Sequence, residues 1–162
     1  MESAGPDPDE VLEWVERIAK YCADQDGVPL IAGRILGWLT VCDPAEQSAA
    51  QIAEAIGASR ASLTTNLRLL SSVGFLTQST HRGERTTYYR VDDDAWARVV
   101  QRQVASFTSL GGILRDGIGI VGEPERGARL RVAHEVFAWL DKVLTDAPPL
   151  PSVRPRTGNG EP

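Results

Sequence analysis

The 162-residue sequence contains few residues that form cross-links or metal sites. It has two cysteines, Cys22 and Cys42, with no Cys-x-x-Cys pair, and its two histidines, His81 and His134, lie far apart in the sequence. Two cysteines exclude a disulfide framework, and a zinc site would lack the clustered ligands that the metal needs. We therefore expect no structural metal and no cofactor.

The sequence also lacks long apolar runs and the motifs of common enzymes. No apolar stretch approaches the length of about 20 residues that crosses a bilayer, and the acidic N-terminus has neither the basic segment nor the apolar core of a signal peptide. We find no glycine-rich phosphate loop and no His-Glu-x-x-His motif. These features predict a cytoplasmic protein that is not an enzyme and has no membrane partner.

The spacing of apolar residues divides the chain into four segments. A helix is predicted within residues 1–27, a DNA-binding domain over 28–92 and further helices over 93–145. The Pro/Gly-rich residues 146–162 lack a core pattern and predict a disordered tail. Four glycines are expected to loosen the end of the first C-terminal helix: Gly111, Gly112, Gly117 and Gly119.

The middle segment has the order of elements of a winged helix-turn-helix. Helices are predicted over 28–42, 48–57 and 59–73, the first of them apolar on nearly all sides and therefore buried. From residue 75 the pattern changes to Thr/Tyr/Val-rich runs around a turn that contains Gly83, which predicts a β-hairpin. The fold class is thus mainly α with a small β-hairpin wing, flanked by N- and C-terminal dimerisation helices.

The helix over 59–73 has the composition of a DNA recognition helix. Leu63, Leu67 and Leu70 share one face, which must hold the helix against its neighbours. The opposite face has no acid and consists of arginine with small or hydroxylated residues, which permit close approach and hydrogen bonds to phosphates and bases. The predicted DNA contacts on this helix are Ser59, Arg60, Ala61, Ser62, Thr64, Thr65 and Arg68.

The hairpin supplies two further candidates, Arg82 and Arg85, on either side of Gly83. An arginine on a flexible tip can enter a narrow minor groove, and we favour Arg82 for this role. The alternative for Arg85 is an ion pair with an acid that holds the shape of the wing. Tyr88 and Tyr89 are neighbours in a strand, so one is expected to pack inward and the other to face out.

The net charge of −5 does not exclude DNA binding, because it is unevenly distributed. Residues 46–90 contain five arginines and three acids, whereas the rest of the chain has 12 basic and 19 acidic residues. So few arginines predict modest non-specific affinity. The acidic balance supports an alternative function, a winged-helix module that binds protein and has no DNA specificity of its own.

Several motifs occur together in a specific order: AGRILG in the apolar helix, the DP that ends it, IAEAIGASRASLTTNLRLL, and RGERTTYYRV in the wing. With this order, residues 28–92 resemble the GbsR-type branch of the MarR family of bacterial transcriptional regulators. The resemblance implies a homodimer built from the first and last helices, repression by blocking a promoter, and release by a small-molecule effector. It implies DNA contacts at Ser59 to Arg68 and at Arg82 and Arg85, and it leaves the effector unidentified.

The terminal helices predict a homodimer independently of this resemblance. Their apolar seams exceed what a domain of about 65 residues can cover, and uncovered seams drive association. A twofold dimer would place its recognition helices about one DNA turn apart on a pseudo-palindromic operator. We therefore predict a sequence-specific, double-stranded DNA-binding regulator that acts as a ligand-responsive repressor.

Two kinds of switch remain open from the sequence alone. Aromatic faces can cage a quaternary ammonium ion, although tryptophans are more often core or interface anchors. The four tryptophans are Trp14, Trp38, Trp96 and Trp139. Oxidation of Cys22 and Cys42 is the other switch, but a thiol beside an apolar run is more often inert. We favour structural roles for both sets.

Overall fold

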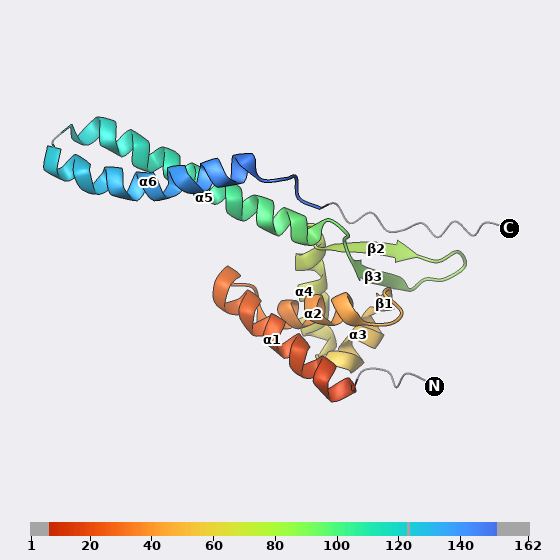
Figure 1. The fold of residues 1–162 in the computed structure, drawn as a ribbon. Helices are drawn as coiled ribbons and strands as arrows, with labels where there is room; N and C mark the ends of the chain where they lie inside the picture. Colours follow the sequence, from red (N-terminus) through yellow and green to blue (C-terminus); the bar gives the residue numbers. More distant parts are fainter. Residues whose placement is uncertain (1–6, 123, 152–162) are drawn as a thin grey trace, which may run out of the picture. The chain divides into compact units, whose positions relative to one another are not determined.

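A computed structural model describes residues 7–122 and 124–151, and the chain divides into two units between Ala95 and Trp96. The first unit contains four helices: α1 (Pro8–Asp26), α2 (Leu30–Val41), α3 (Ala49–Ile56) and α4 (Arg60–Ser72). It also contains three strands: β1 (Gln47–Ser48), β2 (Leu76–Thr80) and β3 (Thr87–Val91). The second unit is built from α5 (Ala95–Val121) and α6 (Pro124–Asp146) (Figure 1). The predicted fold, a mainly helical winged helix-turn-helix with long C-terminal helices, is confirmed.

Small residues allow α1 and α2 to pack closely. A Cβ added to Gly33 would lie 2.7 Å from the Cα atom of Ala19, and one added to Gly37 would lie 3.3 Å from that of Val15. Both glycines belong to the AGRILG motif, and both facing residues are buried. The motif therefore has a packing role, which is to bring the backbones of the two helices together.

One ion pair joins the same two helices. The Arg34 guanidinium donates to both carboxylate oxygens of Glu16, at 2.7 and 3.0 Å. This hydrogen bonding lowers the pKa of Glu16 and raises that of Arg34. The two side chains are 33% and 28% exposed, so water partly screens the interaction.

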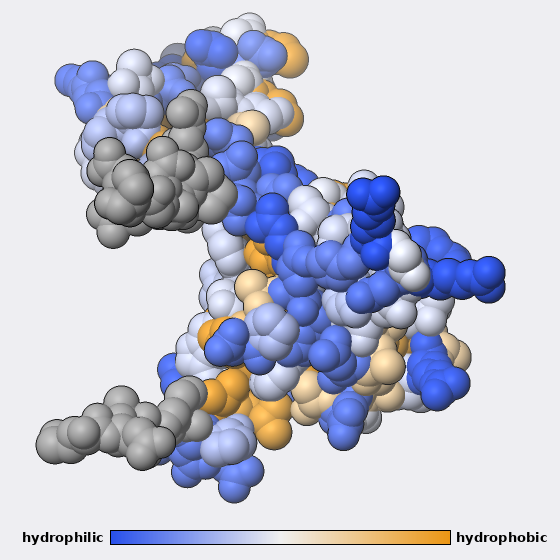
Figure 2. All heavy atoms as spheres, turned by 90° about the vertical axis from the view of Figure 1, so that its right-hand side faces the viewer, coloured by the Kyte–Doolittle hydropathy of each residue, from blue (hydrophilic) through white to orange (hydrophobic). Residues whose placement is uncertain are grey.

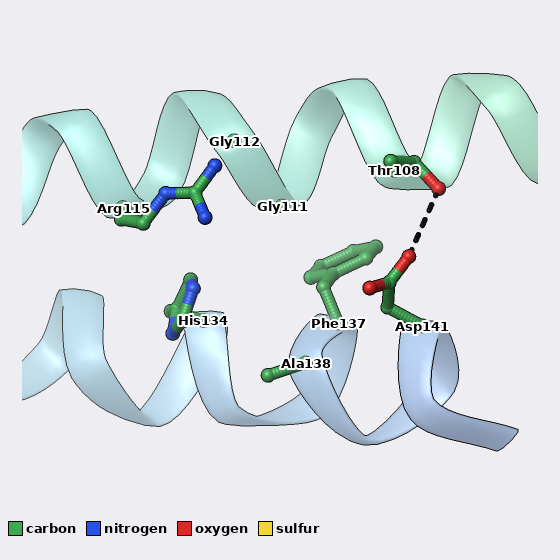
Figure 3. A pocket seen from close by; sticks show the side chains of 8 residues that line it. All are labelled: Thr108, Gly111, Gly112, Arg115, His134, Phe137, Ala138 and Asp141. Carbon is green, nitrogen blue, oxygen red and sulfur yellow. Dashed lines mark hydrogen bonds between the residues drawn. The ribbon is translucent and has the colours of Figure 1, made fainter. Parts of the chain in front are cut away.

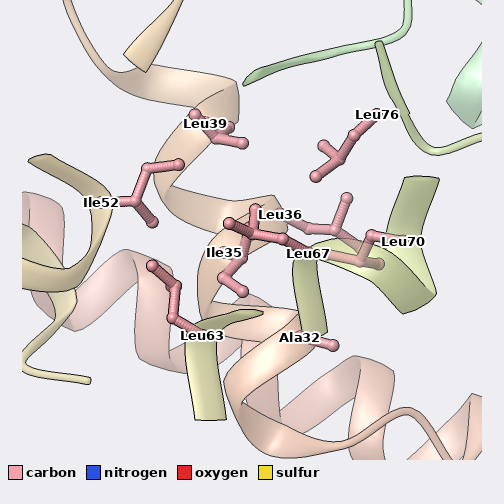
Figure 4. Packing of buried hydrophobic residues seen from close by; sticks show 9 residues of the cluster. All are labelled: Ala32, Ile35, Leu36, Leu39, Ile52, Leu63, Leu67, Leu70 and Leu76. Atoms are coloured by element: carbon pink, nitrogen blue, oxygen red, sulfur yellow. The ribbon is translucent and has the colours of Figure 1, made fainter. Parts of the chain in front are cut away.

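The core of the first unit is centred on α2, as its apolar sequence predicts. Ile35 is fully buried and Leu36 is 2% exposed, and α3, α4 and β2 each contribute to the same cluster. Figure 4 shows the side chains that meet there: Ala32, Ile35, Leu36, Leu39, Ile52, Leu63, Leu67, Leu70 and Leu76. This core fixes the orientation of α4 relative to α2 and α3.

A tight turn joins α3 to α4. Ser48 and Gln51 form a capping box at the start of α3, and Gly57 ends the helix in the left-handed conformation, with φ 63°. Ser59 caps α4 by accepting a hydrogen bond from the Ser62 N–H group. These are the boundaries expected from the sequence, and they produce the predicted helix-turn-helix.

The wing is a three-stranded antiparallel sheet with the order β1-β3-β2. In its register Tyr89 of β3 pairs with Gln47 of β1 and with Gln78 of β2. The turn between β2 and β3 places Gly83 at φ 88°, a conformation that favours glycine. The hairpin was predicted and β1 was not, because two residues carry no recognisable alternation.

The second unit is a hairpin of two long helices that lie side by side (Figure 1). The rings of Phe107 and Phe137 lie 6.3 Å apart, and Thr108 donates a hydrogen bond to Asp141 at 3.4 Å. The prediction that four glycines loosen the end of α5 is wrong, because the helix continues through them to Val121. Close packing explains one of them, since a Cβ at Gly111 would lie 3.2 Å from the Phe137 Cβ atom.

Helix α5 is also long and apolar enough to cross a membrane by length and composition alone. A single helix of this kind is weak evidence for a membrane span, and Arg115 and Asp116 place two charged side chains within it. Residues 152–162 of the predicted tail and the first six residues of the chain lie outside the described residues.

Candidate nucleic-acid interface

Helix α4 presents the predicted recognition face to solvent. Leu63, Leu67 and Leu70 are each 2% exposed and hold the helix on the core. Of the predicted contact residues on the opposite face, Ser62 is half-buried and six are exposed: Ser59, Arg60, Ala61, Thr64, Thr65 and Arg68. The face that the leucine spacing assigned to solvent is therefore the exposed one, and its contact with DNA stays a prediction.

The threonine hydroxyls of this face are bonded to the helix itself. Thr64 donates to the Arg60 carbonyl at 2.8 Å, and Thr65 donates to the Ala61 carbonyl at 3.1 Å. Each hydroxyl oxygen can still accept a hydrogen bond, but donation to a phosphate requires rotation of the side chain. The Ser59 side chain caps α4, so its replacement would lower the stability of the helix as well as affect DNA binding.

Four of the five arginines between residues 46 and 90 have no ion-pair partner in the part of the chain that the structure describes. They are the predicted contacts Arg60, Arg68, Arg82 and Arg85, and all four are exposed. The fifth, Arg90, donates to Asp93 at 3.0 Å. Figure 2 views the molecule from the side toward which the wing projects in Figure 1, and hydrophilic residues cover much of that face.

The wing tip is shaped by Tyr88 and not by Arg85. The Tyr88 hydroxyl donates to Glu84 at 2.9 Å, which raises the pKa of the phenol, and its ring lies 4.5 Å from that of His81. Arg85 has no acid partner among the described residues, so the alternative role suggested for it is not supported. Tyr89 packs against the core, which confirms that one of the two tyrosines faces inward.

Sequence reasoning missed Glu46, which it counted only as one of three acids in this region. The Glu46 carboxylate contacts three residues of the wing, Ser79, His81 and Arg90. The sequence signal was weak, because it depends on the pairing of β1 with β3.

Three of the residues considered for a switch, Trp38, Cys22 and Cys42, have a hydrogen-bond partner or a buried setting that fits a structural role. Trp38 donates from its indole nitrogen to Gln47 at 2.8 Å, which attaches β1 to α2. Burial raises the pKa of both Cys22 and Cys42 and so lowers the fraction of reactive thiolate. The described residues contain no group of three or more potential metal ligands.

The second unit contains a cleft of about 200 Å³ between α5 and α6 (Figure 3). Arg115 and His134 line it at one end, Phe137 lines the middle, and Asp141 bonds to Thr108 at the other end. Cationic, aromatic and acidic groups are thus available to a small polar molecule in this hairpin.

Comparison with known proteins decides the family. Over 149 residues, 91% of this chain and 89% of the relative, the sequence is 33% identical to the HTH-type transcriptional regulator MmpR5 of Mycobacterium tuberculosis. The chain belongs to the MarR family of transcriptional regulators. Within this family, residues 94–147 match the MmpR5-like MarR regulators.

A solved structure supports the assignment of this MarR-family protein. The crystal structure of a transcriptional regulator is 32% identical and covers 85% of this chain and 94% of its own, with a TM-score of 0.59. The predicted MarR family, its DNA-binding regulatory function and the exclusion of an enzyme are confirmed. The matches point to MmpR5-like regulators and give no specific support to the GbsR branch.

Proposed function

We propose that this regulator binds a pseudo-palindromic operator as a homodimer, with α4 in the major groove and the wing tip in the adjacent minor groove. The observation that carries the proposal is the exposed, acid-free face of α4 with two unpaired arginines, Arg60 and Arg68. The wing adds Arg82 and Arg85, which are also exposed and have no ion-pair partner among the described residues. Unpaired guanidinium groups can bind phosphate or guanine without first breaking an ion pair.

Apolar stripes on the second unit support the dimer. On α6 these side chains recur every three or four residues, which places them on one face, and Val132, Val136 and Trp139 are 60–65% exposed. On α5, Ile113 and Ile120 are 64% and 84% exposed. A second copy would remove these side chains from water, and this contribution favours association. In this proposal residues 1–27 and 93–145 hold the dimer and 28–92 bind DNA.

In this proposal the dimer acts in the cytoplasm as a repressor that a small-molecule effector releases. The cleft between α5 and α6 supports the effector part, because Arg115 and His134 offer donors to an anionic group. Thermal unfolding with a panel of small carboxylates tests this part. A stabilising compound should lose its effect in the Arg115→Ala variant, and a compound that stabilises both proteins equally binds elsewhere.

Binding to DNA from the region upstream of the protein's own gene tests the main proposal. We expect fluorescence anisotropy to show affinity that falls steeply with salt and exceeds the affinity for a scrambled duplex. Equal affinity for both duplexes would contradict sequence-specific recognition. Absence of binding at low salt would favour the alternative, a winged-helix module that binds protein.

A further inference from the structure

The Glu46 carboxylate lies where three residues of the wing meet. Its Oε2 atom accepts a hydrogen bond from the Ser79 hydroxyl at 3.3 Å and lies 3.6 Å from His81 Nε2. Its Oε1 atom lies 3.9 Å from Nε of Arg90. Ser79 is on β2, Arg90 is on β3 and His81 follows β2, so a single carboxylate contacts both strands of the hairpin and the start of its tip.

The sheet register explains why these groups meet. Ser48, Tyr88 and Ser79 are paired across the three strands, so their side chains share one face of the sheet. Glu46 and Arg90 are two residues from Ser48 and Tyr88 along their chains, and alternation places them on that same face. Glu46 immediately precedes β1 and the capped start of α3, so it links the wing to the helix-turn-helix.

We propose that Glu46 is a positioning residue for DNA binding, which holds the wing so that Arg82 and Arg85 face the minor groove. The tip from His81 to Arg85 is exposed, and the Glu46 contacts fix the strand ends from which it projects. A wing that is already held in place loses less conformational entropy on binding DNA than a mobile wing would lose, and this favours binding. The inference rests on the proposed DNA-binding function.

If Glu46 acted through its charge alone, replacing it by an amide would change the affinity for DNA in the opposite direction, so an experiment can distinguish the two roles. A carboxylate near a DNA-binding surface repels phosphate, so replacing it by an amide should strengthen binding if Glu46 is merely an exposed acid. If Glu46 holds the wing, the same replacement should weaken binding. The sign of the change therefore separates the two roles.

The experiment compares Glu46→Gln with Glu54→Gln in the full-length protein, by anisotropy with the upstream duplex. Glu54 is an exposed acid on α3 that has no partner among the described residues, so its replacement matches the charge change. We expect Glu46→Gln to bind about fivefold more weakly and Glu54→Gln to bind as tightly as the wild type or more tightly.

A double-mutant cycle shows whether Glu46 acts through the wing arginines. The cost of Glu46→Gln should largely disappear when Arg82 and Arg85 are both alanine, because the wing then has no contact to position. Ser79→Ala, which removes one contact and no charge, should weaken binding in the same direction and to a smaller extent. Thermal unfolding confirms that each variant is folded.

The proposal is overturned if Glu46→Gln binds as tightly as the wild type or more tightly, or if its cost is unchanged without the wing arginines. If a destabilised Glu46→Gln protein prevents the comparison, Ser79→Ala decides, and unaltered affinity in that variant also overturns the proposal. Failure of the wild type to prefer the upstream duplex is a different result, because it contradicts the proposed function and not the role of Glu46.

Discussion

At the scale of single residues, two groups of ionised side chains in the first unit have different environments. Those that stabilise the fold are paired, such as Glu16 with Arg34 between α1 and α2, at 2.7 Å. Those assigned to DNA, such as Arg68, are exposed and have no ion-pair partner among the described residues. This separation lets the binding surface change partners without loss of stability.

The pair of Glu16 and Arg34 predicts a pH-dependent stability. Its hydrogen bond lowers the pKa of Glu16 below the ordinary 4.5, so the contribution is present at neutral pH and is lost as the pH falls through the lowered pKa. Glu16→Gln should therefore reduce the free energy of unfolding near pH 7 and reduce it less at a pH well below 4.5, as measured by urea unfolding. Glu13→Gln, at an exposed position on the same helix, is the control and should change little at either pH.

A loss of stability in Glu16→Gln that is the same at both pH values would contradict this account. Such a result would mean that the ionised pair adds nothing beyond the packing of the side chain.

At the scale of elements, the contact of α1 with α2 depends on one glycine. Gly33→Ala would place a Cβ atom 2.7 Å from the Ala19 backbone, so the helices would have to move apart. We expect the free energy of unfolding to fall by about 1–3 kcal/mol, measured by chemical denaturation.

Gly119→Ala is the matched control for this substitution. It is also helical, but an added Cβ meets no atom within 4 Å, so the change should be neutral or stabilising by about 0.5–1 kcal/mol. Equal effects of the two substitutions would show that intrinsic helix preference, and not contact between α1 and α2, decides the role of Gly33.

The elements also show what the sequence alone could predict. The buried face of α4 followed from Leu63, Leu67 and Leu70, because helical periodicity is a local property of the chain. Strand β1 and the contacts of Glu46 did not follow, since they depend on pairing between residues more than 30 positions apart in the sequence. Helix α5 shows the same limit, because its glycines were expected to weaken a helix that continues through them.

At the scale of the whole molecule, the proposed dimer explains why the second unit exposes so many apolar side chains. Trp139 is 65% exposed and lies on the stripe that also contains Val132 and Val136. Trp139→Glu should shift the protein toward monomer in sedimentation velocity, because a charge would be buried in the interface. Lys142→Glu changes the charge more but lies off the stripe, so its oligomeric state should stay that of the wild type.

Equal sedimentation of the wild type and Trp139→Glu, with both monomeric, would contradict the dimer. In that case the apolar composition of α5 would not be explained by a dimer interface, and binding of the protein to lipid vesicles would test whether the helix contacts a membrane.

If the exposed arginines of α4 bind DNA, Arg68→Ala should have a lower affinity for the upstream duplex than the wild type, and this measurement tests the proposed role of the helix. Arg129→Ala removes the same charge from an exposed position on α6 and is the control. We predict that Arg68→Ala costs about 1–3 kcal/mol of binding free energy, roughly a 5- to 150-fold loss, and relaxes the preference over a scrambled duplex, whereas Arg129→Ala binds like the wild type. Equal affinities of the two variants would contradict the assignment of α4 as the recognition helix.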